Sequence, residues 1–147
     1  LKVKIDKKFD LIIFNHTLEH VEDPVKFINQ ASAALNKGGY IYVDLPNFDS
    51  LSAKILKDRW PLLLPNEHLW HFTQEALNIL LERFGFKTVY INKSSGIWDY
   101  QNPFYGILIS LIQFKKRFFR EVMTLIPSFI TTQLNMGSDL MIIAKKV

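Results

Sequence analysis

The chain has 147 residues, of which 48% are hydrophobic and 22% charged, with a formal net charge of +4. This length predicts a single domain with a real core, and the mild charge gives no support for a nucleic-acid partner. The absence of cysteine excludes disulfides and thiolate metal sites and favours a cytoplasmic location. No run of about 18 apolar residues is present, so we expect no spanning helix, and no signal peptide is visible.

The first predicted elements form a strand–helix–strand unit within Phe9–Asn47. Phe9–Phe14 is a nearly continuous apolar run, typical of a strand buried on both faces. Asp23 suits the cap of a helix and Pro24 suits its first turn. The apolar positions of this helix recur at helical spacing, at Val25, Ile28, Ala31 and Leu35.

The second half of this unit is a turn and another strand. Gly38–Gly39 is expected to end the helix, because glycine accepts the left-handed conformation found at helix C-termini. Tyr40–Leu45 is then predicted to be a strand, and a strand–helix–strand connection of this kind favours parallel strands. The segment 48–71 follows as a long loop with a short helix at Leu51–Leu56, and loops of this length are typically lids or binding loops.

Further elements follow the long loop. Thr73 is expected to cap a helix that Gly85 ends, and Lys87–Ile91 is predicted to be a third strand. Asp139–Ala144 is predicted to be the last strand. Repeats and domain linkers are not apparent, so residues 1–147 are interpreted as one α/β domain.

A helical region separates the third strand from the last. Pro103–Ile126 is predicted to form one long helix or two shorter ones, stopped before Pro127. Its basic cluster, Lys115–Arg120, fits a solvated helix face, an amphipathic helix on a membrane surface, or a helix packed against a partner. We favour burial against a partner or a missing part of the protein and leave peripheral membrane contact through 103–126 as an alternative. Nucleic acid is the least favoured interpretation.

All four histidines fall in the loops that follow predicted strands. Ligands of open α/β sheets bind at the carboxyl ends of the strands, so we expect at least one histidine to be functional. They are His16, His20, His68 and His71.

The segment His16–His20 reads H-x-x-E-H, the zinc motif of inverted-order metallopeptidases. That chemistry requires one helix to present both histidines. Here the motif follows a strand directly, and a new helix begins at Asp23. A metallopeptidase is therefore the least favoured of the enzymatic interpretations.

Three segments together resemble class I S-adenosylmethionine-dependent methyltransferases of the small-molecule branch. They read FDLIIFNHTLEHVEDP, LNKGGYIYVDLPN and HLWHFTQEALNILLERFGFKTV, within Phe9–Ile91. The resemblance implies a partial Rossmann-like sheet, strands four to seven of that fold, with flanking helices. Three strands would be parallel, and Asp139–Ala144 would be the antiparallel last strand. Residues 92–138 would be a helical insertion.

The chain departs from the family pattern in one respect. The Gly-rich loop after strand one and the acidic residue after strand two have no counterpart in this sequence. The chain therefore resembles the C-terminal, substrate-side portion of such an enzyme, and we expect it to bind cofactor weakly alone. A sheet that begins at strand four leaves an exposed edge, which predicts a homodimer.

The resemblance also implies a cofactor, S-adenosylmethionine, and the residues that contact it. Backbone at Asn15 would meet the methionine end of the cofactor. The pocket would be lined by His16, Thr17 and Leu18.

The acceptor would be a small molecule such as a sugar, a quinone or a related metabolite. A hydroxyl acceptor needs a base, which His20 or His71 could supply, and Trp60, Trp70 and Phe72 could wall its pocket or simply pack. No metal site is predicted. Relatives that methylate phenolic oxygens can nevertheless hold a divalent ion through acidic residues and a histidine in this loop. Glu19 and His20 match that pattern, whereas His16 replaces an acidic position.

A different class of function stays open. An α/β module that lacks the Gly-rich loop could be catalytically incomplete and act in dimerisation or scaffolding through its sheet edge.

Overall fold

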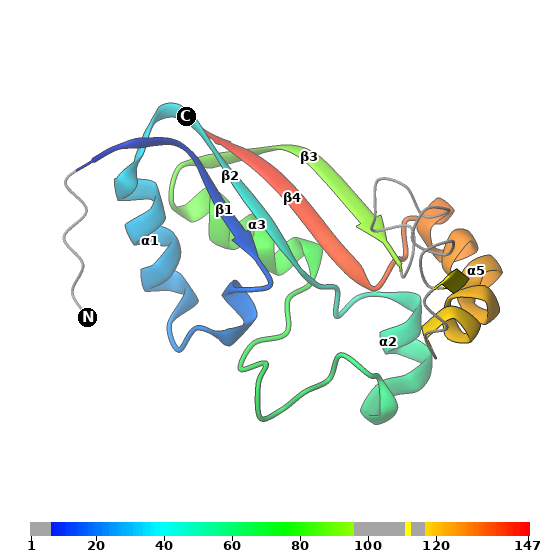
Figure 1. The fold of residues 1–147 in the computed structure, drawn as a ribbon. Coiled ribbons are helices and arrows are strands. Elements are labelled where there is room, and N and C mark those ends of the chain that lie inside the picture. The colour runs from blue at the N-terminus through cyan, green and yellow to red at the C-terminus, as the bar shows by residue number, and fades with distance from the viewer. Residues whose placement is uncertain (1–6, 96–110, 113–116) are drawn as a thin grey trace.

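The computed structural model describes residues 7–95, 111–112 and 117–147 (Figure 1). Within them, one sheet has the strand order β1-β2-β4-β3. Strands β1 and β2 are parallel, and β4 is antiparallel to both of its neighbours, β2 and β3. Three strands thus share one direction and the last is reversed, as the resemblance implied. The strands are β1 (Phe9–Asn15), β2 (Leu35–Pro46), β3 (Phe86–Ser94) and β4 (Asp139–Lys146).

Two helices, α1 (Pro24–Ala34) and α3 (Gln74–Arg83), cover one face of the sheet (Figure 1). Both begin at the predicted caps. Asp23 accepts a hydrogen bond from the Lys26 backbone at 2.9 Å, and Thr73 caps α3 in the same way. Local side-chain chemistry therefore sets both helix starts. The shorter helices are α2 (Leu51–Leu56), η1 (Leu18–His20) and η2 (Lys57–Arg59).

The hydrophobic core lies between the sheet and these two helices. Alternate residues of the central strands are fully buried there and pack against Ile28 of α1 and Leu77 of α3. Burying each such side chain stabilises the fold by about 1.5–3 kcal/mol. The buried strand residues are Ile41, Val43 and Leu45 of β2, and Leu140, Ile142 and Ala144 of β4.

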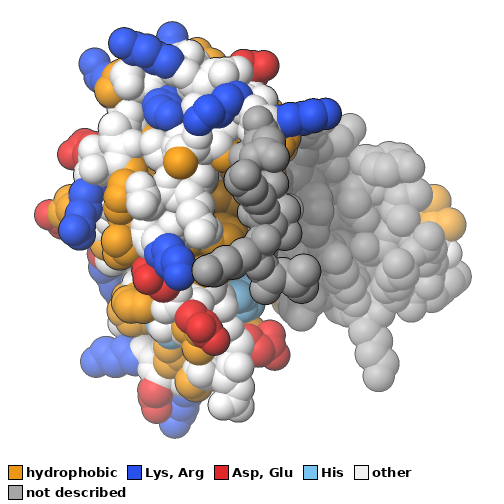
Figure 2. Space-filling view, turned by 90° about the vertical axis from the view of Figure 1, so that its left-hand side faces the viewer, with side chains coloured by type: hydrophobic (Ala, Val, Ile, Leu, Met, Phe, Trp, Pro, Cys, Tyr) orange, Lys and Arg blue, Asp and Glu red, His pale blue; other side chains and the backbone are white. Residues whose placement is uncertain are grey.

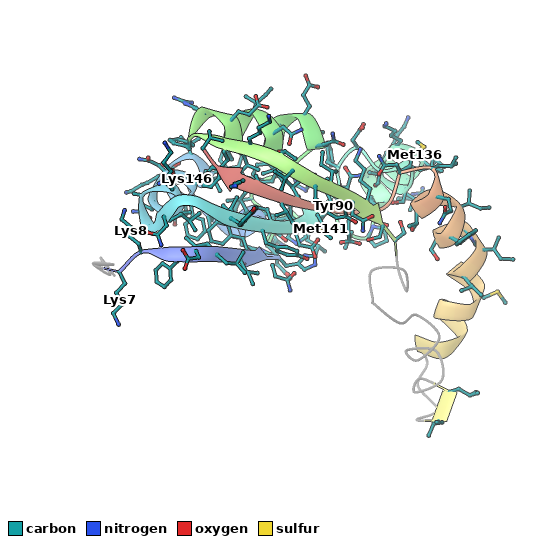
Figure 3. The ribbon with its side chains drawn as sticks, turned by 90° about the horizontal axis from the view of Figure 1, so that it is seen from above. Lys7, Lys8, Tyr90, Met136, Met141 and Lys146 are labelled. Carbon is teal, nitrogen blue, oxygen red and sulfur yellow. The ribbon has the colours of Figure 1, made fainter. Side chains whose placement is uncertain are left out.

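The opposite face of the sheet is partly open. Ile13 of β1 is 60% exposed, and Tyr90 of β3, at the other end of the same row of paired residues, is 51% exposed. Met141 lies on the next row of that face and can be followed in Figure 3. Figure 2, which looks at the molecule from the left of Figure 1, shows hydrophobic side chains reaching the surface among charged ones.

The predicted end of the first helix is wrong. Helix α1 ends at Ala34 and does not run to Gly38–Gly39. Leu35 is extended and already paired with β1. The side chain of Leu35 is 1% exposed, so its burial in the core favours the early turn into the sheet. Gly38 has φ +80°, and a Cβ on Gly39 would lie 3.1 Å from the Asp10 backbone oxygen. The two glycines therefore allow the backbone to adopt the irregular conformation that the β1–β2 pairing has at this point.

The predicted stop before Pro127 is also wrong. Helix α5 (Arg117–Gln133) runs through Pro127, which cannot donate a hydrogen bond to the Met123 carbonyl. Met123 is 79% exposed, so this carbonyl lies on a solvent-facing part of the helix. Residues 103–110 and 113–116 of the predicted helix lie outside the described residues. Among the described helices, none combines the length and the apolar character that crossing a membrane requires.

Candidate functional site

The carboxyl ends of β1 and β2 form one rim of the sheet. The backbone N–H of His16 donates to the Asp44 carbonyl at 2.8 Å, which holds the two strand ends together. His16 has φ +45°, an uncommon conformation for a residue other than glycine. The chain therefore turns sharply off β1 before the short helix η1 begins.

The predicted cofactor residues divide between the surface and the core. Asn15 and His16 are exposed, and Thr17 is half-buried with its hydroxyl donating to the Asn15 carbonyl at 3.0 Å. Leu18 is completely buried in the hydrophobic core, so its side chain anchors the loop. The exposed residues can reach a ligand above the strand end. They fit one wall of a cofactor site, whereas the Gly-rich loop that forms another wall in the family has no counterpart here.

Glu19 is a buried carboxylate at the centre of the site. Its side chain is 1% exposed, and its Oε1 lies 3.3 Å from His16 Nδ1 and 3.8 Å from His20 Nε2. Its Oε2 is buried without a hydrogen-bond partner. A buried, half-satisfied carboxylate is costly, so this position calls for a functional explanation.

The long loop between α2 and α3 is tied down over η1. His20 Nδ1 donates to the Glu67 carbonyl at 2.7 Å. The backbone N–H of Trp70 donates to the Glu19 carbonyl, and its indole N–H donates to the Val21 carbonyl at 2.9 Å. These bonds bring residues far apart in the sequence into one cluster.

The remaining two histidines enter the cluster from this loop. The ring centroid of His68 lies 4.8 Å from that of His20 and 6.4 Å from that of His71. His68 is 8% exposed, and its Nδ1 donates to the Leu62 carbonyl at 2.8 Å. His71 Nε2 is buried without a partner. Burial, together with the charge of a protonated His68, lowers the pKa of His71, so its imidazole is neutral at neutral pH.

The structure does not present the H-x-x-E-H segment as a peptidase site would. Helix η1 covers only Leu18–His20, and His16 lies outside it at positive φ. No single helix therefore carries both histidines. Instead, both imidazoles of the segment face the carboxylate of Glu19.

The aromatic residues predicted to wall an acceptor pocket mostly serve packing. Trp60 is 3% exposed, with its indole N–H donating to the Ser52 hydroxyl, and Phe72 belongs to the core. Trp70 alone of the three is largely exposed.

Sequence reasoning missed Asp44, whose side chain lies near the same rim. Burial raises the pKa of Asp44, while the Tyr42 hydroxyl, which donates to it at 3.1 Å, opposes that rise. Burial and the neighbouring carboxylate raise the pKa of Tyr42 to about 12. The position of Asp44 at the carboxyl end of a predicted strand was a signal that could have identified it.

Comparison with known proteins identifies the family of the chain. The family described as "Methyltransferase domain" matches residues 4–91. An uncharacterised protein of Methanocaldococcus jannaschii is 33% identical over 84 residues, which cover 57% of this chain and 41% of that protein.

Several solved structures share the fold. An S-adenosylmethionine-dependent methyltransferase of Thermotoga maritima, named a possible histamine N-methyltransferase, superposes with a TM-score of 0.59 at 18% identity. One from Archaeoglobus fulgidus gives 0.57 at 21% identity. Their alignments take in 100% and 97% of this chain, but 59% and 61% of those chains.

The chain thus spans less than two thirds of the length of each of these relatives. The family match nevertheless covers more than half of the chain itself, including both strands and both loops of the rim. The reversed last strand is the one that the resemblance implied. The chain belongs to the methyltransferase domain family.

Proposed function

We propose that this chain supplies the acceptor-side portion of an S-adenosylmethionine-dependent methyltransferase that acts on a small molecule. The observation that carries the proposal is the histidine cluster at the carboxyl ends of β1 and β2, within the residues that match the family. Ligands of such sheets bind at this edge. The cofactor supplies a methyl group already activated by its sulfonium.

The residues of the rim then have distinct tasks. Asn15 and His16, which are exposed at the end of β1, would contact the methionine end of the cofactor and help to position it for in-line attack. The tied-down long loop covers η1 and excludes water from this side. The accepted compound is a metabolite with a free hydroxyl, such as a sugar or the quinol form of a quinone.

A hydroxyl acceptor must lose a proton during transfer. His71 is suited to take it, because burial keeps its imidazole neutral and its Nε2 lacks a hydrogen-bond partner that an acceptor hydroxyl would provide. His20 is the second candidate, since its Nδ1 carries the proton donated to the Glu67 carbonyl and its Nε2 is left as an acceptor.

The test is methyl transfer from labelled S-adenosylmethionine to a panel of phenols, quinols and sugars, using the longest natural polypeptide that contains this sequence. We expect transfer to at least one acceptor, and a loss of about 100-fold or more in His71→Gln. A matched control is Gln74→Ala, at the start of α3. Absence of both transfer and cofactor binding would contradict the proposal.

A further inference from the structure

Three potential metal ligands converge beside the rim. Glu19, His20 and His68 each offer one ligating atom, and these atoms lie within 4.8 Å of one another. Glu19 and His20 belong to η1, whereas His68 comes from the long loop. The cluster therefore brings together two segments that are far apart in the sequence, η1 and the long loop.

The carboxylate in this cluster lacks the partners that its burial demands. Glu19 is 1% exposed and its Oε2 has no hydrogen-bond partner. The side chains that the structure places beside it are the imidazoles of His16, at 3.3 Å, and His20, at 3.8 Å. A cation at this point would neutralise the buried charge and give the free oxygen a ligand role.

Both histidines of the cluster are held in the orientation of metal ligands. A backbone carbonyl can only accept, so Nδ1 of His20 and Nδ1 of His68 must each carry a proton, donated to the carbonyls of Glu67 and Leu62. Each neutral ring then keeps a lone pair on Nε2. Fixing the tautomer by a carbonyl on the other ring nitrogen is typical of metal-binding histidines.

The other histidine of the H-x-x-E-H segment, His16, lies outside the three-ligand cluster. His16 Nδ1 contacts Glu19 Oε1 at 3.3 Å, and its side chain is 50% exposed. It therefore orients the carboxylate from outside the three-ligand cluster.

We propose that Glu19, His20 and His68 bind one zinc-type divalent ion. Two imidazole nitrogens and one carboxylate are a set that Zn²⁺ accepts, with an open fourth position, whereas Mg²⁺ and Ca²⁺ prefer oxygen ligands alone. Tetrahedral zinc with bonds of about 2.0–2.1 Å places its ligand atoms about 3.3 Å apart. The ligand atoms, which lie within 4.8 Å of one another in the structure, would draw closer together around the ion.

The bound ion fastens the long loop to η1 and so to the end of β1. It also occupies Nε2 of His20, which leaves His71 as the proton acceptor at the rim. The metal site itself does not depend on methyl transfer, and it differs from the peptidase motif because Glu19 is a ligand and His68 takes the place of His16.

The test is zinc binding to the tag-free chain by isothermal titration, with cobalt absorption reporting the coordination geometry. We expect one Zn²⁺ per chain and a tetrahedral cobalt spectrum. We expect a weakening of about 100-fold or more in His68→Ala and Glu19→Gln. Circular dichroism of each variant without metal shows whether it is folded.

One variant serves as a matched control. Glu67→Gln removes an exposed neighbouring carboxylate but keeps the backbone carbonyl that holds His20. We expect it to bind Zn²⁺ within about threefold of the parent chain. The proposal is overturned if the parent chain binds no Zn²⁺, if folded His68→Ala binds it as well as the parent, or if Mg²⁺ competes at equal concentration.

Discussion

At the scale of single residues, the side chain of Asp44 at the rim has a perturbed pKa. Asp44 is half-buried, and its burial raises its pKa above the ordinary value of 3.8. The folded protein thus binds this proton more tightly than the unfolded chain does. The stability that Asp44 contributes is fully present below its ordinary pKa and is lost as pH rises through the raised one.

Replacing Asp44 by asparagine tests this directly. The asparagine side chain would still offer an oxygen to the Tyr42 hydroxyl but would not titrate. We expect Asp44→Asn to equal the parent in urea stability at the acid end and to exceed it increasingly toward neutral pH. Parallel stability–pH profiles for the two proteins would show that the carboxyl is not perturbed.

At the scale of elements, helix α3 has one face packed in the core and another exposed to solvent. Leu77 is fully buried and Ile79, two residues later, is 61% exposed. We expect Leu77→Ala to lower the free energy of unfolding by about 2–5 kcal/mol, because it leaves a cavity in the core. We expect Ile79→Ala to change it by no more than about 0.5 kcal/mol. Urea denaturation of both variants measures the contrast, and equal losses would contradict the assignment of this face.

The elements were largely predictable because their signals are local. Hydrophobic spacing located α3, and the side chains of Asp23 and Thr73 located two helix starts. Helix ends were harder to predict, because the burial of Leu35 and the passage of α5 through Pro127 depend on tertiary surroundings that local rules omit.

The site was predictable only in part. The position of the histidines after the strands predicted that they would lie together at one edge of the sheet, since the carboxyl ends of parallel strands meet there. The proximity of Glu19 to His68 was not predictable, because hydrogen bonds to backbone carbonyls hold the long loop over η1. Every residue has such a carbonyl, so the sequence carries no signal for this contact.

At the scale of the whole molecule, strand β1 exposes apolar side chains at the edge of the described sheet. β1 lies at one end of the described sheet, and Leu11 and Ile13 are more than half exposed. An apolar groove of about 330 Å³ runs between β1 and α1 and is lined in part by Phe9, Phe14 and Phe27. Exposed strand edges of this kind pair with other chains.

We therefore propose that the chain forms a homodimer through β1. Sedimentation velocity should show a dimer for the parent chain and a monomer for the double substitution Leu11→Lys and Ile13→Lys, because lysine on an edge strand opposes pairing. Ile79→Lys, on the helix-covered side of the sheet, is the matched control and should leave the dimer intact. A parent chain that is monomeric throughout the concentration range would refute this interface.

The central claim is that the carboxyl end of β1 forms part of a cofactor site. The most direct measurement is the amide NMR spectrum of this chain, assigned and titrated with S-adenosylmethionine, because chemical shifts detect weak binding and locate it. We predict shifts centred on Asn15–Leu18, with α5 unaffected. No shift at saturating cofactor, or shifts confined to the groove between β1 and α1, would contradict the account.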